Sequence, residues 1–221
     1  MSAEQGKPLR LVFAEFAPYQ YEQDGRPAGI GVKAVQRVLE RDLGFSLELR
    51  MVPNYGRALA EVSSGGADGF FLASQNLERD KVAVFSEPLM VNRWSWFFNV
   101  DAFLEPNSAQ FLATARVATL LHTNTHRWLN EQGYRHIMPV MKSSLLPRLL
   151  DQERIDAVFL AEVVFAQEAA ATGFEVEDFT QVVAMAKPFG IYISNHYLEE
   201  NKGFMTTLNE AIKRDKRLLS Q

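Results

Sequence analysis

Polar side chains suited to ligand binding follow the apolar run from Asp68 to Ala73, which has the composition of a buried parallel strand. Ser74 and Asn76 come directly after this run, and Arg79 follows three residues later. Ligands of open α/β sheets bind at the carboxyl ends of strands, so this position favours ligand contact; a turn-forming pair is the alternative. The Arg79 guanidinium offers a planar fork that binds a carboxylate bidentately, although an arginine in a polar loop more often pairs with a neighbouring acid.

A second candidate region lies at Thr123 and Asn124, where we predict the amino terminus of a helix that runs to Gln132. Helix N-termini present free N–H groups and a positive dipole end, which suit an anionic ligand; a simple N-cap is compatible with that role. His122 and His126 are four residues apart, the spacing of a metal pair on a helix. No third ligand accompanies them at a recognisable spacing, so we expect cap and surface histidines.

The composition excludes several functional classes. The chain has no cysteine, which excludes a disulfide scaffold, Cys-ligated zinc, iron–sulfur clusters and thiol catalysis. It has no Gly-rich phosphate loop and no G-x-S-x-G motif. The 23 Lys and Arg residues against 27 Asp and Glu residues give a net charge of −4, which argues against nucleic acid as a partner. We expect no metal, no cofactor and no enzymatic activity.

Strand and helix patterns alternate along the chain in two series, which indicates α/β architecture with mainly parallel sheets. The first series has predicted strands at 9–13, 47–51 and 68–73 and predicted helices at 32–43 and 55–62. The second has predicted strands at 94–98, 116–121 and 156–161 and predicted helices at 123–132, 144–150 and 162–171. A strand near 191–194 and an amphipathic helix through Phe204, Leu208 and Ile212 follow.

The two series contain a matching hexapeptide. Residues 68–73 and 156–161 both follow the pattern Asp-x-x-Phe-Leu-Ala, and each comes after a short predicted helix. The match is too short to prove duplication, and coincidence between two buried strands is the alternative. We interpret the match as a sign that the two series form two units of the same architecture.

Several short motifs occur in a fixed order, and together they resemble a known family. The motifs are Phe16-Ala17-Pro18-Tyr19, Gly29-Ile30-Gly31-Val32, Tyr55 before a short helix, Gly66-Ala67-Asp68, Glu78-Arg79 with Phe85-Ser86-Glu87-Pro88, and Arg154-Ile155-Asp156-Ala157. Across roughly residues 8–215 the chain resembles the bacterial extracellular solute-binding proteins of the amino-acid-binding class, which have the type II periplasmic binding fold.

The resemblance implies a clamshell of two α/β lobes joined by two crossover segments, with ligand bound between lobes that close by hinge bending. Lobe 1 would hold residues 7–90 with 188–221, and lobe 2 residues 92–186. Residues 1–6 would be a disordered N-terminal end or a cloning remnant. At roughly 150 residues per domain, a chain of 221 residues corresponds to about 1.5 domains. This length fits two small lobes of this kind.

The resemblance also implies roles for individual residues. Arg79 matches the family arginine that grips the ligand carboxylate, and Ser74 and Asn76 fall where ligand contacts are usual. Aromatic rings that pack on the ligand or back the cleft correspond to Phe16, Tyr19 and Tyr55, for which packing near the hinge is the alternative.

Three positions depart from the pattern or extend it. Ala161 stands where amino-acid binders usually carry an Asp that pairs with the ligand ammonium. This departure favours a ligand that has a carboxylate but no ammonium group that needs an acidic partner at this position. Arg57 follows Tyr55 and could bring a second positive charge, although an exposed helical arginine is the simpler interpretation. His122 stands where the family commonly has Gly, so the approach of backbone to ligand would differ there.

These features predict a monomeric, periplasmic solute-binding protein of an ABC-type uptake system, whose signal peptide has been removed. It would bind a small solute that bears a carboxylate and deliver it to a membrane permease. The alternatives are a ligand-sensing ectodomain of a membrane signalling protein and a cyclic-acid dehydratase with the same fold. Glu162 and His122 are the candidate acid/base groups for the dehydratase.

Overall fold

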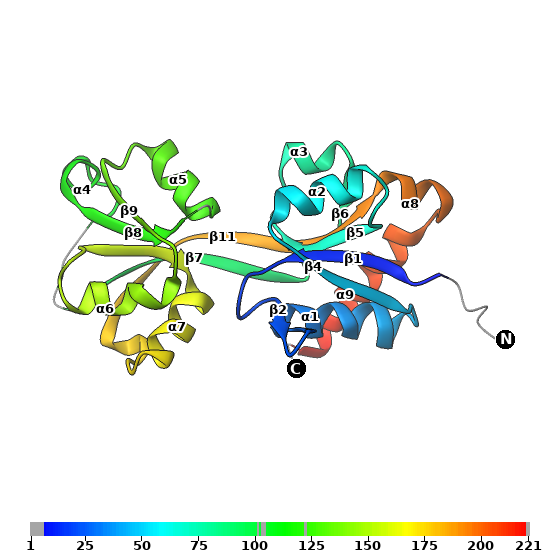
Figure 1. The fold of residues 1–221 in the computed structure, drawn as a ribbon, viewed down its shortest axis with the longest axis horizontal. Helices are drawn as coiled ribbons and strands as arrows, with labels where there is room; N and C mark the ends of the chain where they lie inside the picture. Colours follow the sequence, from blue (N-terminus) through cyan, green and yellow to red (C-terminus); the bar gives the residue numbers. More distant parts are fainter. Residues whose placement is uncertain (1–6, 101, 103–104, 122, 220–221) are drawn as a thin grey trace. The chain divides into compact units, whose positions relative to one another are not determined.

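The computed structural model describes residues 7–100, 102, 105–121 and 123–219 (Figure 1). Its contacts divide the chain into two compact units. Unit 1 is Met1–Val91 with Pro188–Gln221, and unit 2 is Asn92–Lys187. The chain passes between the units twice, once within strand β7 (Met90–Asn99) and once within strand β11 (Phe179–Ser194).

Unit 1 is built on a mainly parallel sheet in the order β4-β1-β5-β11. Strand β1 (Leu9–Ala14) pairs in parallel with β4 (Leu47–Val52) and β5 (Gly69–Ala73). Strand β11 runs antiparallel to β5 and to the short β6 (Ala83–Phe85). All five residues of β5 are buried, as expected for an apolar strand covered on both faces.

Helices cover both faces of the unit 1 sheet. Figure 1 shows α2 and α3 on one side of this sheet and α1 and α9 on the other. The helices are α1 (Ile30–Gln36), α2 (Tyr55–Ser63), α3 (Leu77–Asp80), α8 (Asn195–Glu200) and α9 (Phe204–Leu219). A small hairpin of β2 (Tyr21–Gln23) and β3 (Arg26–Ala28) precedes α1, where the sequence indicates a turn.

The predicted helix over residues 32–43 differs from the observed one. It begins at Ile30, and from Arg37 to Asp42 it is a π-helix. Gly44 follows with a φ of 75°, the left-handed conformation that glycine adopts readily at helix ends. Within the π-helix, Arg37 donates two hydrogen bonds to the buried carboxylate of Asp215 on α9. This ion pair, distant in sequence, fixes the π-helical segment against α9.

The strands of unit 2 continue the sheet order as β7-β10-β8-β9. Strands β10 (Ala157–Ala161), β8 (Arg116–Leu120) and β9 (His136–Val140) are parallel, and β7 is antiparallel to β10. The helices are α4 (Ala109–Thr114), α5 (Asn124–Gln132), α6 (Leu146–Asp151) and α7 (Glu162–Ala171), with 3-10 turns η2 (Ser143–Leu145) and η3 (Val176–Asp178).

Strand β9 was missed by the sequence prediction. It contains Pro139, and most of its residues are exposed or half-buried, so it lacks the continuous apolar run of a central strand. Proline is tolerated at a sheet edge, which is where β9 lies. The predicted strand near 191–194 is also longer than expected, because β11 begins at Phe179.

The core of unit 2 is rich in aromatic rings. Trp96 is 2% exposed and lies 4.4 Å from Phe159 and 5.4 Å from Tyr134 between ring centroids. Trp94 meets Phe159 edge-on at 6.0 Å. Both tryptophans are therefore core residues.

The two Asp-x-x-Phe-Leu-Ala runs form β5 and β10, and each carries the same ion pair at its amino end. In unit 1, the Asp68 carboxylate accepts hydrogen bonds from the backbone N–H of Arg10 (2.9 Å) and from its Nη2 (2.7 Å). In unit 2, the Asp156 carboxylate accepts the same two bonds from Arg116 (2.6 and 2.7 Å). We call this arrangement the Arg–Asp clasp.

The clasps agree in further detail. In each, Nη2 of the arginine also donates to the carbonyl oxygen three residues before the aspartate, that of Gly65 (3.2 Å) or Glu153 (2.9 Å). The hydrogen bonds and charge of Arg116 hold the pKa of Asp156 below its usual range, against the opposing effect of burial. The repeat seen in sequence therefore extends to arginine partners that the hexapeptide alone does not reveal.

Candidate functional site

Arg79 lies on a one-turn helix at the carboxyl end of β5. Asn76 caps this helix, because its Oδ1 accepts a hydrogen bond from the backbone N–H of Arg79 (3.0 Å). The arginine is only 8% exposed, which is unusual for a guanidinium. The capped turn thus brings a cation into a mostly buried position directly after a central strand.

Aromatic rings and a carbonyl oxygen surround this cation. The Cζ atom of Arg79 lies 5.1 Å from the ring centroid of Tyr55 and 5.8 Å from that of Phe70, distances typical of cation–π contacts. Its Nη1 donates a hydrogen bond to the carbonyl oxygen of Ser74. These contacts restrict the orientation of the guanidinium.

Tyr55 is tied to the sheet by its hydroxyl group. The hydroxyl donates to the carbonyl oxygen of Leu72 (2.5 Å) and accepts from Nε2 of Gln20 (2.6 Å). Burial raises the pKa of Tyr55, and the nearby charge of Arg79 opposes that shift only in part. The phenol therefore stays neutral and positions a ring beside the guanidinium.

Gln20 is a member of this site that the sequence analysis missed. It is fully buried, and its Nε2 also donates to the carbonyl oxygen of Ala14 at the end of β1 (2.8 Å). Its Oε1 is buried and has no hydrogen-bond partner among the residues that the structure describes. Gln20 directly follows the aromatic residues Phe16 and Tyr19, and no sequence motif marks it as a site residue. Only its tertiary contacts identify it.

Ser74 and Asn76 have different surroundings. The Oγ of Ser74 is buried and accepts or donates no hydrogen bond within the described part of the chain. The backbone N–H of Asn76 donates to the hydroxyl of Tyr192 (3.1 Å), which in turn donates to the carboxylate of Asp80 (2.9 Å). Tyr192, from β11, thus bonds to both ends of the turn that carries Arg79; the sequence analysis did not identify it.

The loop from Phe16 to Tyr19 forms an aromatic cluster of its own. Phe16 and Tyr19 stack at 5.4 Å between centroids, and both contact Phe189 edge-on at 6.2 and 5.5 Å. Tyr19 is 1% exposed and belongs to the core, whereas Phe16 is half-buried. Of the two, Phe16 retains surface for a ligand.

Arg57 lies apart from these residues, on the exposed face of α2. Its side chain is 60% exposed and pairs with Glu61 one helical turn later (2.5 Å). Glu61 also pairs with Arg50 (3.0 Å), and hydrogen bonds from Arg50 are the main cause of its lowered pKa. Arg57 is therefore engaged in a surface ion-pair network.

In unit 2, Thr123 is the N-cap of α5. Its Oγ1 accepts from the backbone N–H of His126 (3.3 Å) and contacts Oγ1 of Thr125 (2.8 Å), which also contacts that of the buried Thr119 (2.8 Å). Asn124 is exposed at the first helical position. The predicted site residue His122 lies outside the described residues.

Glu162 opens α7 directly after β10. Its Oε2 is buried, with no hydrogen-bond partner among the described residues. Nη1 of Arg93 lies 3.9 Å from this oxygen, too far for a hydrogen bond. In the hexapeptide repeat, Glu162 occupies the position of Ser74. The first residue after each strand therefore holds a buried polar atom that makes no hydrogen bond within the described part of the chain.

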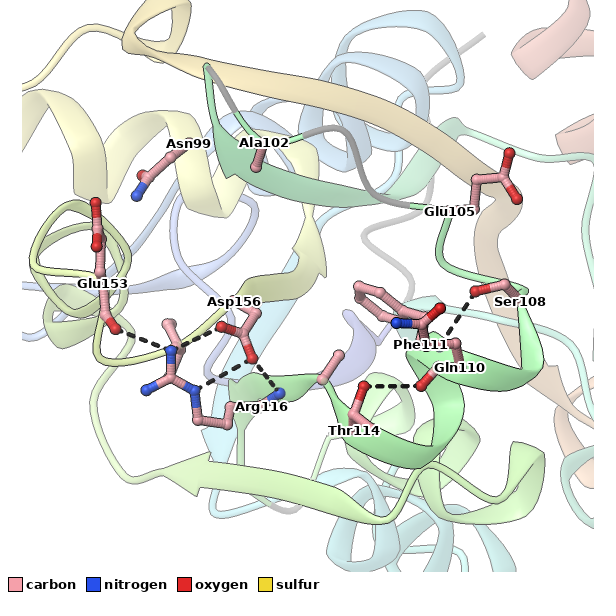
Figure 2. A pocket seen from close by; sticks show the side chains of 12 residues that line it. Asn99, Ala102, Glu105, Ser108, Gln110, Phe111, Thr114, Arg116, Glu153 and Asp156 are labelled. Carbon is pink, nitrogen blue, oxygen red and sulfur yellow. Dashed lines mark hydrogen bonds and ion pairs between the residues drawn. The ribbon is translucent and has the colours of Figure 1, made fainter.

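A separate pocket of about 800 Å³ lies at the amino ends of β8 and β10 in unit 2. Figure 2 shows that the Arg116–Asp156 clasp forms part of its wall, with Arg116 also reaching Glu153. These charges already pair with each other. The pocket lies at the opposite strand ends from the residues described above, and the paired charges of Arg116 and Asp156 in its wall serve the fold.

Two kinds of feature are absent among the residues that the structure describes. No helix among them is both long and apolar enough to cross a membrane. No group of three or more His, Asp or Glu side chains within the described ranges is arranged to hold a metal ion.

Comparison with known proteins gives the fold. No family model and no curated protein sequence matches the chain. The ligand-binding core of GluR0 in complex with L-glutamate aligns with a TM-score of 0.75 and 14% identity, over 97% of this chain and 96% of that one. A histidine kinase sensor domain similar to periplasmic binding proteins aligns with a TM-score of 0.74 and 18% identity, over 99% and 94%.

A third solved structure is the ancestral amino acid-binding protein AncCDT-1, a precursor of cyclohexadienyl dehydratase. It aligns with a TM-score of 0.68 and 21% identity, over 95% of this chain and 89% of that chain. These neighbours have periplasmic-binding-protein-like folds, and most of them are binding proteins. The α/β fold expected from the sequence is confirmed: this chain has the fold of the type II periplasmic binding proteins.

Proposed function

We propose that this chain is the solute-binding protein of an ABC-type uptake system and binds a small solute that bears a carboxylate. The observation that carries the proposal is the buried guanidinium of Arg79, held against the ring of Tyr55 and hydrogen-bonded to the carbonyl oxygen of Ser74. The Oγ of Ser74 is buried and has no hydrogen-bond partner among the described residues. A guanidinium with little exposure binds a carboxylate strongly, because water competes little for its donors. The serine hydroxyl can donate a further hydrogen bond to the same anion.

Other residues complete the proposed site. In unit 1, the half-buried Phe16 and the ring of Tyr55 supply apolar surface for the body of the solute. In unit 2, the N-terminus of α5, with Thr123 and Asn124, supplies donors for an anionic group. The proposed binding involves hinge bending within β7 and β11, where the chain passes from one unit to the other.

The remaining parts of the proposal concern location and partners. We propose a periplasmic, monomeric protein that passes its solute to a membrane permease, with no enzymatic step and no cofactor. The support is the fold that this chain shares with amino-acid-binding neighbours.

The test compares conservative variants of two arginines in unit 1. We expect Arg79→Lys to weaken binding of the solute about 100-fold, because an ammonium cannot reproduce the planar fork. Arg26→Lys, at an exposed position on β3, is the matched control and should bind as wild type does. A thermal-shift screen of amino acids and organic acids identifies the solute, and isothermal titration measures both variants. Equal affinity of wild type and Arg79→Lys would show the proposal to be wrong.

A sensory role is the second candidate, and one comparison favours it. The histidine kinase sensor domain aligns over 99% of this chain. In a sensor, the same solute would bind, but a membrane-anchored signalling protein would replace the permease as partner. Co-purification of the native gene product from membranes, followed by identification of the attached domain or partner, separates the two roles.

A cyclic-acid dehydratase is the third candidate function, because the neighbour AncCDT-1 is a precursor of cyclohexadienyl dehydratase. Glu162 would be its acid/base group in unit 2. We expect no elimination from prephenate-like acids in the presence of this protein; turnover that Glu162→Gln abolishes would favour the enzyme instead.

A further inference from the structure

Leu72 has an unusual backbone conformation for a strand residue. Its φ is 50°, in the left-handed region, and its side chain is fully buried in β5. The other two non-glycine residues with a positive φ in the described structure, Asp24 and Glu153, lie in turns. A leucine inside a strand rarely adopts this conformation, because its Cβ crowds the neighbouring backbone. Its surroundings must therefore hold it there.

The pairing of β5 with β11 shows what this conformation does. The two strands are antiparallel, and Phe71 pairs with Ile191. Ala73, two residues later, pairs with Gly190, the immediate neighbour of Ile191. Leu72 is therefore the extra residue of a β-bulge. An extra residue shifts the alternation of side chains between the two faces of a sheet, so the bulge determines where the residues that follow it point.

The repeated hexapeptide offers an internal control within the chain. Leu160 has in β10 the position that Leu72 has in β5, and it is equally buried. It is not left-handed, and β10 pairs with β7 in unbroken register from Val158 to Ala161. The same residue in the same local pattern is thus regular in unit 2. The bulge therefore results from contacts that are particular to unit 1.

Two sets of contacts in unit 1 accommodate the bulge. The carbonyl oxygen of Leu72 accepts a hydrogen bond from the Tyr55 hydroxyl (2.5 Å), which accepts one from Nε2 of Gln20 (2.6 Å). Gln20 also donates to the carbonyl oxygen of Ala14 (2.8 Å), so this chain of bonds connects the bulge to the end of β1. Gly31 leaves room for the Leu72 side chain, because a Cβ at Gly31 would overlap it.

The turn after the bulge carries the guanidinium of the proposed site. Ser74 is the second residue after Leu72, and its carbonyl oxygen accepts a hydrogen bond from Nη1 of Arg79. Tyr55 contacts both features, since its hydroxyl bonds to the bulge and its ring lies 5.1 Å from Cζ of Arg79. A change in the bulge would therefore redirect the carbonyl oxygen and the ring that orient the guanidinium.

We propose that the bulge at Leu72 positions the turn that bears Arg79, and that Gln20 holds the bulge in place through the Tyr55 hydroxyl. Leu72 and Gln20 are thus positioning residues, which act on the guanidinium through other groups. The expected effect on affinity rests on the proposed solute-binding function, whereas the effect on the turn concerns unit 1 alone.

An isoleucine at the bulge tests the first part of the proposal. Leu72→Ile keeps the side-chain volume, but a β-branched residue tolerates a positive φ poorly. Leu160→Ile is the matched control, because β-branching suits an extended strand residue. In the ligand-free protein, the N–H groups of Asn76 and Arg79 donate to the Tyr192 hydroxyl and to Asn76 Oδ1. We expect NMR to show about tenfold faster hydrogen exchange of both groups in Leu72→Ile and no change in Leu160→Ile.

Gln20→Met tests the second part. Methionine is of similar length but cannot donate to the Tyr55 hydroxyl. We expect the same faster exchange at Asn76 and Arg79, while the N–H groups between β1 and β4 stay as protected as in wild type. A common acceleration throughout unit 1 would show that Gln20 serves only overall stability, which contradicts its positioning role. Unchanged exchange of the turn in both Gln20→Met and Leu72→Ile would overturn the whole inference.

A double-mutant comparison checks the route from Gln20 to the bulge. In a Tyr55→Phe background the hydroxyl is absent, so Gln20→Met should cause no further acceleration of exchange in the turn. An additional acceleration as large as that in wild type would show that Gln20 does not act through Tyr55.

Binding measurements distinguish this inference from the function on which it rests. The probes are the standard amino acids, succinate, malate and citrate, screened by thermal shift. A compound that stabilises wild type should bind Leu72→Ile and Gln20→Met about tenfold more weakly in isothermal titration, and Leu160→Ile as it binds wild type. Equal binding by all four proteins would contradict the positioning role and leave the solute-binding function standing. If the exchange results hold and no compound stabilises wild type, the proposed function is contradicted and the role of the bulge in the turn is supported.

Discussion

The strands β5 and β10 are alike at their amino ends and differ at their carboxyl ends. Each begins with an Arg–Asp clasp whose hydrogen bonds agree atom for atom. Beyond the last alanine, unit 1 continues into a capped turn that buries a cation, whereas unit 2 continues into a helix that opens with an acid. The amino end, which secures the fold, is repeated, and the carboxyl end has diverged in charge.

The clasps should contribute unequally to stability. The Asp68 side chain is 15% exposed and that of Asp156 is 32% exposed. Removal of the better buried carboxylate leaves more unsatisfied donors out of reach of water, so we expect Asp68→Ala to cost about 3 kcal/mol and Asp156→Ala about 2 kcal/mol of unfolding free energy. Urea denaturation measures both. A larger loss in Asp156→Ala would contradict this ranking.

Tyr192 tests whether the turn after β5 needs a fixed geometry. Tyr192→Phe removes the hydroxyl that bonds to the Asn76 N–H and to Asp80, and keeps the ring stacked on Phe70. We expect a loss of about 1–2 kcal/mol in stability and about tenfold in solute affinity, because Arg79 is less well oriented. Tyr197→Phe, at the first turn of α8, is the matched control and should keep full affinity.

Low pH should remove the stabilisation that the Arg–Asp clasp gives to unit 2. Because Arg116 lowers the folded-state pKa of Asp156, this carboxylate stabilises the protein at pH values above its unfolded pKa of about 3.9. That stabilisation is lost as the pH falls through the lower folded pKa. We expect Asp156→Asn to be less stable than wild type near neutral pH, with a difference of about 1 kcal/mol or more that narrows below about pH 4. A difference independent of pH would show that the charge is unimportant.

Arg57 should give the smallest effect. Its ion pair with Glu61 is largely exposed, so Arg57→Gln should change stability by about 0.5 kcal/mol or less and leave solute affinity unchanged. A marked loss of affinity would show that Arg57 belongs to the binding site and that α2 contributes a second cation to it. Isothermal titration with the solute identified for wild type decides this.

Much of the fold follows from local sequence patterns. The apolar runs place β1, β5 and β10 within one residue, and Thr123 caps α5 as its type predicts. Edge strands and short turns were missed, since β9 and α3 have neither continuous apolar runs nor full helical periods. The sequence could suggest Arg79 through a resemblance, but it could not show the rings against which the guanidinium lies.

The sequence by itself determined the alternation of strands and helices, the repeated hexapeptide and the helix caps, because these depend on neighbours a few residues apart. Only the tertiary structure decided that Gln20 bonds to Tyr55 and that Tyr192 holds the turn of Arg79. It also decided that an oxygen of Glu162 is buried with no hydrogen-bond donor among the described residues. Those features join residues distant along the chain. Their burial and geometry depend on how the strands and helices pack, which no local pattern encodes.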